Sequence, residues 1–239
     1  MERFWSRAEA AEEAPGRFAV LLDGRPIRLP SGAPLAVPSA PLAAALAAEW
    51  QAAGGGKGRG FRLEALPLTR LVGTAIDRIV PDHGAAVATV ARYGASDLLC
   101  YRAEFPPKLA ARQNAAWQPL LDWAACAFES PLVVTAGVVA VAQPEASLAA
   151  LTRAVAEHPP LELSGLGAIV QATGSLVLGL AVSHGRVTAA EAHALATLDE
   201  SFQAEDWGED AEAAKRLRAI AEDIAAAARL IGLARGAAA

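Results

Sequence analysis

The sequence is poor in cysteine and in aromatic residues. Cys100 and Cys126 are the only cysteines, and they form neither a CxxC pair nor a run with histidine at zinc spacing. This argues against a disulfide framework or structural zinc. Aromatic residues make up 5% of the chain and apolar residues 54%, mostly alanine and leucine, which is typical of helical proteins. A chain of 239 residues can bury a stable core without cross-links, as one large domain or two small ones.

The stretch at residues 163–182 lacks charge over about the length needed to span a bilayer. Four glycines and the polar Gln171 dilute it, and no basic flank would set an orientation. We therefore expect a buried central helix and no membrane insertion. The opening "MERFWSRAEAAEE" has no apolar segment and carries acids among its arginines, so it resembles neither a secretory signal nor a transit peptide. We expect the protein to stay in the cytoplasm.

Positive charge is absent from a long part of the second half. Eight carboxylates and no lysine or arginine lie between Arg186 and Lys215, and residues 198–210, "LDESFQAEDWGED", hold six of them around a tryptophan. Residues 1–80 carry ten basic and eight acidic side chains, whereas residues 81–239 carry eleven and eighteen. Such a field repels nucleic acid and anionic membranes and attracts a basic surface, so nucleic-acid binding is disfavoured.

The hydrophobic period changes near residue 80. Before it, "RFAVLLDGRPIRL" alternates on either side of an Asp-Gly pair and predicts an antiparallel meander. A helix should follow from Ser39 as N-cap, with Trp50 as a structural side chain on its apolar stripe. After residue 80 the apolar spacing is helical almost throughout, except for an extended segment at 132–143. We predict an α+β protein with a β-rich N-terminal domain, residues 1–80, and a helical C-terminal domain, residues 81–239.

The glycine-rich segment at 54–60, "GGGKGRG", invites comparison with a phosphate-binding loop. A Walker loop needs glycine and a hydroxyl where this chain has Gln51 and Gly58. We therefore expect a flexible connector here, to which the sequence assigns no role.

The acidic stretch should belong to a helix that begins at a capping box, Thr188 with Glu191. At 100° per residue one face of this helix is apolar and the other is not. The apolar face carries Leu195, Leu198 and Phe202, and the opposite face carries Glu200, Gln203, Ala204 and Trp207. Two outcomes stay open for Trp207: it points away from the core beside Glu200, or Gly208 ends the helix and returns the ring to the core.

Three uses of these acids compete: a metal site, a catalytic pair, or a surface covered by another protein. The carboxylates point around the helix and match no EF-hand spacing. No cofactor loop, GxSxG elbow or cysteine beside a base accompanies them. By elimination, we expect the acids to form a surface that binds a protein partner. The alternative is a small-molecule enzyme that uses an acidic cleft.

Eight motifs, in order, resemble the assembly chaperones of the ATP synthase F1 head that act on its alpha subunit, and they span nearly the whole chain. They are "RFW" at 3–5, "LDGRPIRLPSGAPLAVPS" at 22–39, "AEW" at 48–50, "PLTRLVGTAIDR" at 67–78, "DLLCYRAEFP" at 97–106, "RQNAAWQPLLDWA" at 112–124, "GSLVLGLA" at 174–181 and "LDESFQAEDWGED" at 198–210. The chain departs from the family at residues 54–60, where relatives usually carry a more polar linker.

The resemblance implies a two-part fold and an activity without catalysis or cofactor. Such chaperones hold the free alpha subunit and cover its beta-facing surface until the beta subunit displaces them; their eukaryotic relatives are mitochondrial. We expect this chain to be monomeric when free and to meet alpha through its acidic stretch, which resembles the family's functionally sensitive region around Glu200. The expected contact residues are Asp199, Glu200, Gln203, Glu205, Asp206, Trp207, Glu209 and Asp210.

Overall fold

The computed structural model describes residues 2–137, 139–208 and 210–236. Contacts divide the chain into two compact units. The first consists of residues 1–83 together with 160–165 and 229–239, and the second of residues 84–159 and 166–228. The chain has a small strand region followed by a mainly helical part, which confirms the expected α+β class. The domain division at residue 80 stays a prediction, because compact units describe contacts and not independent folding.

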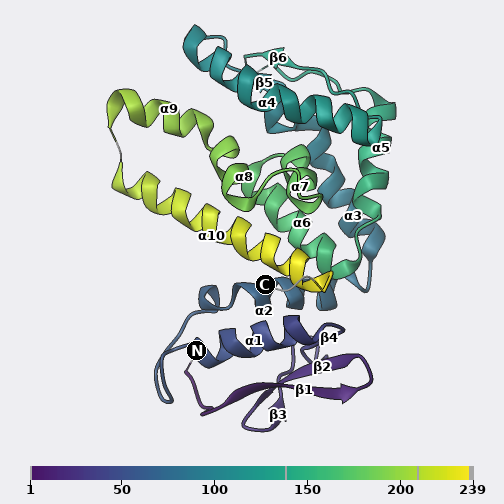
Figure 1. Ribbon diagram of the computed structural model, residues 1–239, viewed down its shortest axis with the longest axis vertical. Helices are drawn as coiled ribbons and strands as arrows, with labels where there is room; N and C mark the ends of the chain where they lie inside the picture. The colour runs from purple at the N-terminus through teal and green to yellow at the C-terminus, as the bar shows by residue number, and fades with distance from the viewer. Residues whose placement is uncertain (1, 138, 209, 237–239) are drawn as a thin grey trace. The chain divides into compact units, whose positions relative to one another are not determined.

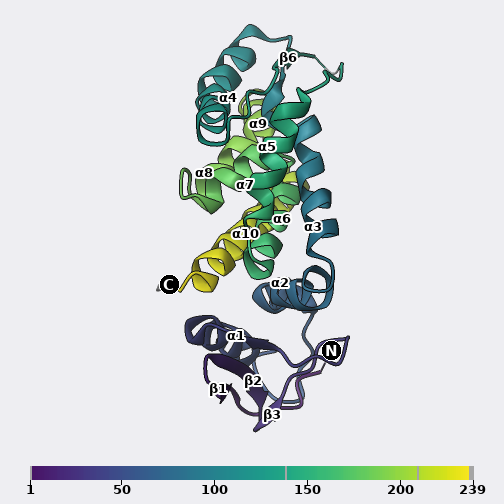
Figure 2. The same ribbon diagram turned by 90° about the vertical axis from the view of Figure 1, so that its right-hand side faces the viewer.

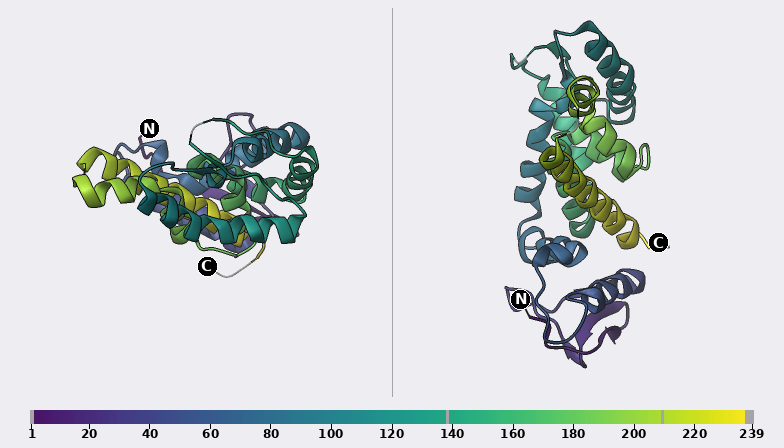
Figure 3. Two further views of the ribbon diagram at one scale, coloured as in Figure 1. Left: turned by 90° about the horizontal axis from the view of Figure 1, so that it is seen from above. Right: turned by 90° about the vertical axis from the view of Figure 1, so that its left-hand side faces the viewer.

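The first unit is a small antiparallel sheet with one long helix against it (Figures 1 and 3). Its strands are β1 (Ala8–Ala14), β2 (Arg17–Leu22), β3 (Arg25–Pro26) and β4 (Ala36–Val37). Strand β2 pairs with each of the others. The Asp-Gly turn forms as expected, with positive φ angles of 48° at Asp23 and 79° at Gly24. The sequence patterns above did not indicate β1.

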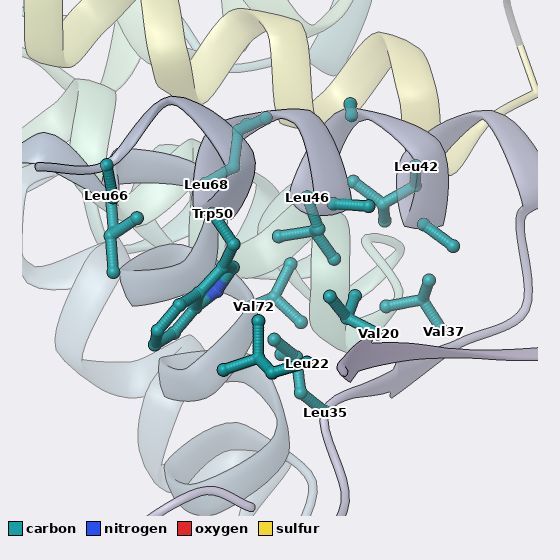
Figure 4. Close-up of a cluster of buried hydrophobic side chains, with 14 of the residues drawn as sticks. Val20, Leu22, Leu35, Val37, Leu42, Leu46, Trp50, Leu66, Leu68 and Val72 are labelled. Atoms are coloured by element: carbon teal, nitrogen blue, oxygen red, sulfur yellow. The ribbon is translucent and has the colours of Figure 1, made fainter. Parts of the chain in front are cut away.

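Helix α1 (Ala40–Ala52) begins as the sequence predicts. The Ser39 hydroxyl accepts the Leu42 amide, and a proline stands in the first turn. Leu42, Leu46 and Trp50 project from α1 into a core that Val20 and other side chains of the sheet also enter (Figure 4). The remaining helices of this region are η1 (Leu63–Ala65), α2 (Pro67–Thr74) and the π-helix η2 (Ala75–Ile79).

Residues 54–60 form a folded loop and not a flexible connector. Gly54, Gly55 and Gly58 take positive φ angles, which glycine adopts without steric cost. The loop holds the N-terminal segment, because the Arg3 amide donates to the Arg59 carbonyl and the Gly58 amide donates to the Arg3 carbonyl, at 2.9 and 2.7 Å. The expectation failed because sequence periodicity does not register a loop that pairs with a distant segment.

The second unit is built almost entirely from helices (Figure 2). They are α3 (His83–Ala91), η3 (Arg92–Ser96), η4 (Leu98–Cys100), α4 (Pro107–Phe128), α5 (Glu145–Ala156), α6 (Pro160–Thr173), α7 (Leu176–Ser183), α8 (Ala189–Ala196), α9 (Leu198–Trp207) and α10 (Ala211–Ala234), of which α3, α6 and α10 also supply residues to the first unit. Two short parallel strands, β5 (Tyr101–Arg102) and β6 (Thr135–Ala136), complete it. Within 132–143, β6 is the only strand found among the described residues.

The uncharged stretch at 163–182 is two helices and not one. Gly174 ends α6 at a φ of 67°, and the Ser175 hydroxyl caps α7 by accepting the Leu178 amide. Both helices are buried along much of their length. Among the described residues, no helix combines the length and the apolar character needed to cross a membrane.

A buried carboxylate joins the start of α7 to η4. The Asp97 carboxylate accepts the amides of Leu99 and Val177, at 3.0 and 2.9 Å, and the Ser175 hydroxyl at 2.7 Å. The side chain is inaccessible to solvent, and this burial raises the pKa of the Asp97 carboxyl, while the three donors act in the opposite direction. Asp97 therefore fixes the position of α7, against which α4 packs.

Candidate protein-binding site

The acidic stretch lies on α9, which is separate from the helix that precedes it. The capping box of Thr188 and Glu191 forms as predicted and begins α8. Helix α8 ends before Thr197, whose φ and ψ are −109° and 23° and whose hydroxyl donates to the His193 carbonyl. The expected single helix from Thr188 onward was wrong, since threonine can bond to its own backbone and interrupt a helix. Periodicity alone did not reveal this break.

Within α9 the predicted division into two faces holds for the side chains that the structure describes. Leu198 and Phe202 are buried in the core of the helical unit, and Leu195, on α8, packs against the same core. Glu200 and Gln203 are exposed, and Ala204 is half-buried. The helical period thus predicted correctly which face of α9 packs against the core of the helical unit.

Helix α4 contributes cations to the acidic stretch, which has no lysine or arginine of its own. The Arg112 guanidinium donates two hydrogen bonds to the Glu205 carboxylate, at 2.6 and 3.0 Å. These bonds hold the pKa of the Glu205 carboxyl below its usual range. The Arg112 guanidinium and the Lys108 ammonium also lie over the Phe202 ring, 5.2 and 5.8 Å from its centre. Arg112 is 93 residues from Glu205 in the sequence, so local charge counting did not detect it.

A second contact between α4 and α9 uses an amide. The Gln113 side-chain nitrogen donates to the Asp199 carboxylate at 2.7 Å, and its oxygen accepts the Ala103 amide at 2.7 Å. Gln113 is buried. It therefore positions the first turn of α9, and the sequence patterns above did not mark it for such a role.

The acids of the stretch have different surroundings. Asp199 and Glu205 bind α4, and Asp210 accepts the amides of Glu212 and Ala213 at 3.2 Å each, as a cap for α10. The exposed Glu200 carboxylate has no ion-pair partner among the residues described. Glu209 and the side chains of Asp206 and Trp207 lie outside what the structure describes, so the two alternatives for the Trp207 ring stay predictions.

The surroundings of these acids favour binding over chemistry. Asp199 and Glu205 contact different side chains of α4 and do not converge on one point. Within the described ranges, no group of three histidine, cysteine, aspartate or glutamate side chains is placed to hold a metal ion. The His158 ring contacts the Ser183 hydroxyl at 2.7 Å, but both side chains are buried, and the other ring nitrogen bonds the Ala154 carbonyl. This pair links the end of α5 to α7.

Trp50, the structural residue predicted on α1, is buried in the first unit. Its indole nitrogen donates to the Thr69 hydroxyl at 2.9 Å, and its carbonyl accepts the indole nitrogen of Trp5 at 3.2 Å. The adjacent Glu49 carboxylate accepts the amides of Leu68 and Thr69 at the start of α2. Burial raises the pKa of Glu49. This group ties α1 to α2 and belongs to the scaffold, not to the acidic surface.

Comparisons with known proteins agree in one family. The family described as ATP12 chaperone protein matches residues 2–125. The solved structure of Atp12 from Paracoccus denitrificans is 41% identical, with a TM-score of 0.88 over 98% of each chain. The Atu1473 protein of Agrobacterium tumefaciens is 38% identical, with a TM-score of 0.89 over 96% of this chain and 85% of that one. The mitochondrial protein atp12 of Schizosaccharomyces pombe is 27% identical over 86% of this chain and 73% of its own length.

Proposed function

Because the chain belongs to the ATP12 chaperone family, we propose that it assists assembly of the ATP synthase F1 sector by binding the free alpha subunit. It shields the beta-facing surface of alpha until beta displaces it. The family and the names of its members support an assembly chaperone and a non-enzymatic role. The alpha subunit as partner rests on the sequence resemblance of the eight motifs. The bacterial relatives support the cytoplasm as the place of action.

The physical task of such a chaperone is reversible coverage. An obligate subunit interface is more apolar than ordinary protein surface and is prone to aggregate when exposed. A cover held partly by charges binds quickly and specifically, and it can give way to a partner that buries more apolar area. An acidic surface on a rigid helix suits this task.

The exposure of Glu200 is the observation that carries the proposal. Its carboxylate is exposed on α9, while Asp199 and Glu205 on the same helix are held by Gln113 and Arg112. The internal contacts fix the helix and leave Glu200 available to a basic group on alpha. We extend the contact surface to the acidic stretch around it, residues 199–210.

Titration calorimetry against isolated alpha subunit at two ionic strengths tests the proposal. We expect Glu200→Lys to raise the dissociation constant about tenfold at low salt, because like charges at a contact cost affinity. This loss of affinity should become smaller as the salt concentration rises, because salt screens the repulsion between like charges. The Debye length falls from about 30 Å at 0.01 M to about 8 Å at 0.15 M.

Glu222→Lys on α10 is the matched control, because it makes the same charge change at an exposed glutamate outside the acidic stretch. Circular dichroism should show all three proteins folded. Equal affinities of wild type and Glu200→Lys at both salt concentrations would show that the exposed face of α9 does not contact alpha. If the wild type does not bind alpha, alpha is not the partner.

A further inference from the structure

A valine-rich loop of the helical unit leaves three valine side chains exposed. We define the valine loop as residues 131–137 and 139–142. None of its described residues is buried, and Val133, Val134 and Val139 are 41%, 37% and 75% exposed. Single exposed apolar residues are ordinary on protein surfaces, whereas several in one short segment point to an interaction site.

Polar contacts hold the backbone of the valine loop in place. The Gln143 side chain closes its base by accepting the Val133 amide at 2.7 Å and donating to the Val133 carbonyl at 2.9 Å. The Ser147 hydroxyl donates to the Pro131 carbonyl, and the Gly137 amide donates to the Arg102 carbonyl. These hydrogen bonds order the loop, together with Leu132, which is half-buried and packs against the core of the helical unit. Figure 2 shows the chain around β6 at the outer edge of the helices.

Phe105 extends the apolar surface from the neighbouring strand. Strands β5 and β6 are parallel, with Arg102 opposite Ala136. Phe105 is three residues after Arg102, and Val139 is three residues after Ala136. Because the strands are parallel, the segments that hold Phe105 and Val139 leave the sheet at the same end. Phe105 is 80% exposed. Aromatic side chains supply much of the binding energy where two proteins meet.

The charges that border the valine loop indicate what covers it. Glu129 and Glu145 flank it in the sequence, Glu104 precedes Phe105, and all three glutamates are exposed. The exposed Lys108 lies three residues after Phe105, so the border is acidic on balance. The Glu104 side chain lies so close to Gly137 that a Cβ on this glycine would come within 2.5 Å of its carboxylate. An acidic border repels the phosphates of an anionic lipid surface, and it repels the same border on a second copy. It suits a protein surface with an apolar centre and a basic border.

The valine loop also connects to the proposed alpha-binding surface through one helix. Phe105 lies two residues before the start of α4, whose Lys108 and Arg112 contact Phe202 on α9. Resting on the function proposed above, we propose that the valine loop and Phe105 form an apolar contact that joins the acidic surface of α9 in holding one client. This proposal requires a client whose exposed subunit-interface surface is apolar at its centre and basic at its border.

Two sets of substitutions test this contact independently. Val133→Thr with Val139→Thr keeps side-chain volume and β-branching but makes the loop polar, and Phe105→Gln removes the aromatic ring. Val80→Thr is the matched control, since Val80 is 61% exposed and lies in the first unit. Against isolated alpha subunit we expect each test variant to weaken binding about tenfold, as for a contact that anchors an interface. The control should bind as the wild type does.

The response to salt separates this contact from that of Glu200. The losses caused by the loop and Phe105 substitutions should persist at high ionic strength, whereas the loss caused by Glu200→Lys should shrink. Wild-type binding that survives all the loop and Phe105 substitutions would overturn the inference while the proposed function stands. Wild type that does not bind alpha at all would overturn both. If the valine double variant does not fold, Phe105→Gln decides.

Two further measurements expose the competing occupants. Light scattering of the free protein should give the molar mass of a monomer. A dimer that the valine substitutions convert to monomer would assign the surface to a second copy of the chain. Sedimentation with vesicles of neutral and anionic lipid should leave the protein in solution. Binding to vesicles that the same substitutions abolish would assign the surface to a membrane. Either result overturns the inference.

Discussion

At the residue scale, buried polar groups distinguish scaffold from surface. Sequence reasoning predicted the burial of Trp50 from its place on an apolar stripe, and the structure confirms that burial. It did not predict that Arg3 and Asp97 would be buried and Glu49 half-buried. Charged residues are rarely buried unless hydrogen bonds satisfy them, and here the partners include residues distant in the sequence, such as Gln51 for Arg3 and Val177 for Asp97. Hydrophobic patterning carries no information about those partners.

Asp97 offers a stability test with a defined dependence on pH. Its pKa is raised in the folded protein, so the folded state takes up this proton at a higher pH than the unfolded state does. The free energy of unfolding should therefore gain a contribution as pH falls through the folded pKa toward 3.8, and lose it as pH rises.

Asp97→Asn should remove that contribution and also place an amide nitrogen where the carboxylate accepts three donors. We expect a loss of about 1–3 kcal/mol at pH 7. The difference in unfolding free energy between wild type and variant should widen at pH 5, as measured by urea denaturation at both values. A difference that is constant or narrows with falling pH would contradict this account of Asp97.

At the element scale, the signals read correctly from the sequence are local ones. The Ser39 cap, the Thr188–Glu191 capping box and the Asp23–Gly24 turn each depend on residues close in sequence, and all three form. The failures involve distant contacts. Strand β1 is composed of alanine and glutamate, which favour helices, yet pairing with β2 makes it a strand.

The valine loop provides the prediction at this scale. Gln143→Met keeps the side-chain length but removes both hydrogen bonds to Val133. Amide hydrogen exchange in residues 131–142 should become faster, whereas exchange in α4 should not change, because the loop's order depends on local polar contacts. Unchanged exchange in the loop would mean that its side chains hold it in place, which would contradict the basis of the apolar contact.

At the scale of the whole molecule, the acidic half of the chain combines charge and exposed apolar surface on helical supports. The sequence alone predicted the acidic stretch and its exposed face, since both follow from composition and helical period. It did not predict the restraint of that stretch by Arg112 and Gln113, or the unburied valine loop, because both depend on which elements pack together. The resemblance supplied the proposed partner, which composition and spacing did not identify.

The central claim is that this chain holds the alpha subunit only until beta arrives. Size-exclusion chromatography with light scattering on the complex with isolated alpha, before and after addition of equimolar beta, tests it most directly. We predict that beta removes alpha from the complex and that the chain elutes alone as a monomer, because the proposed function has both proteins cover the same surface of alpha. A stable complex containing this chain, alpha and beta together would contradict the claim.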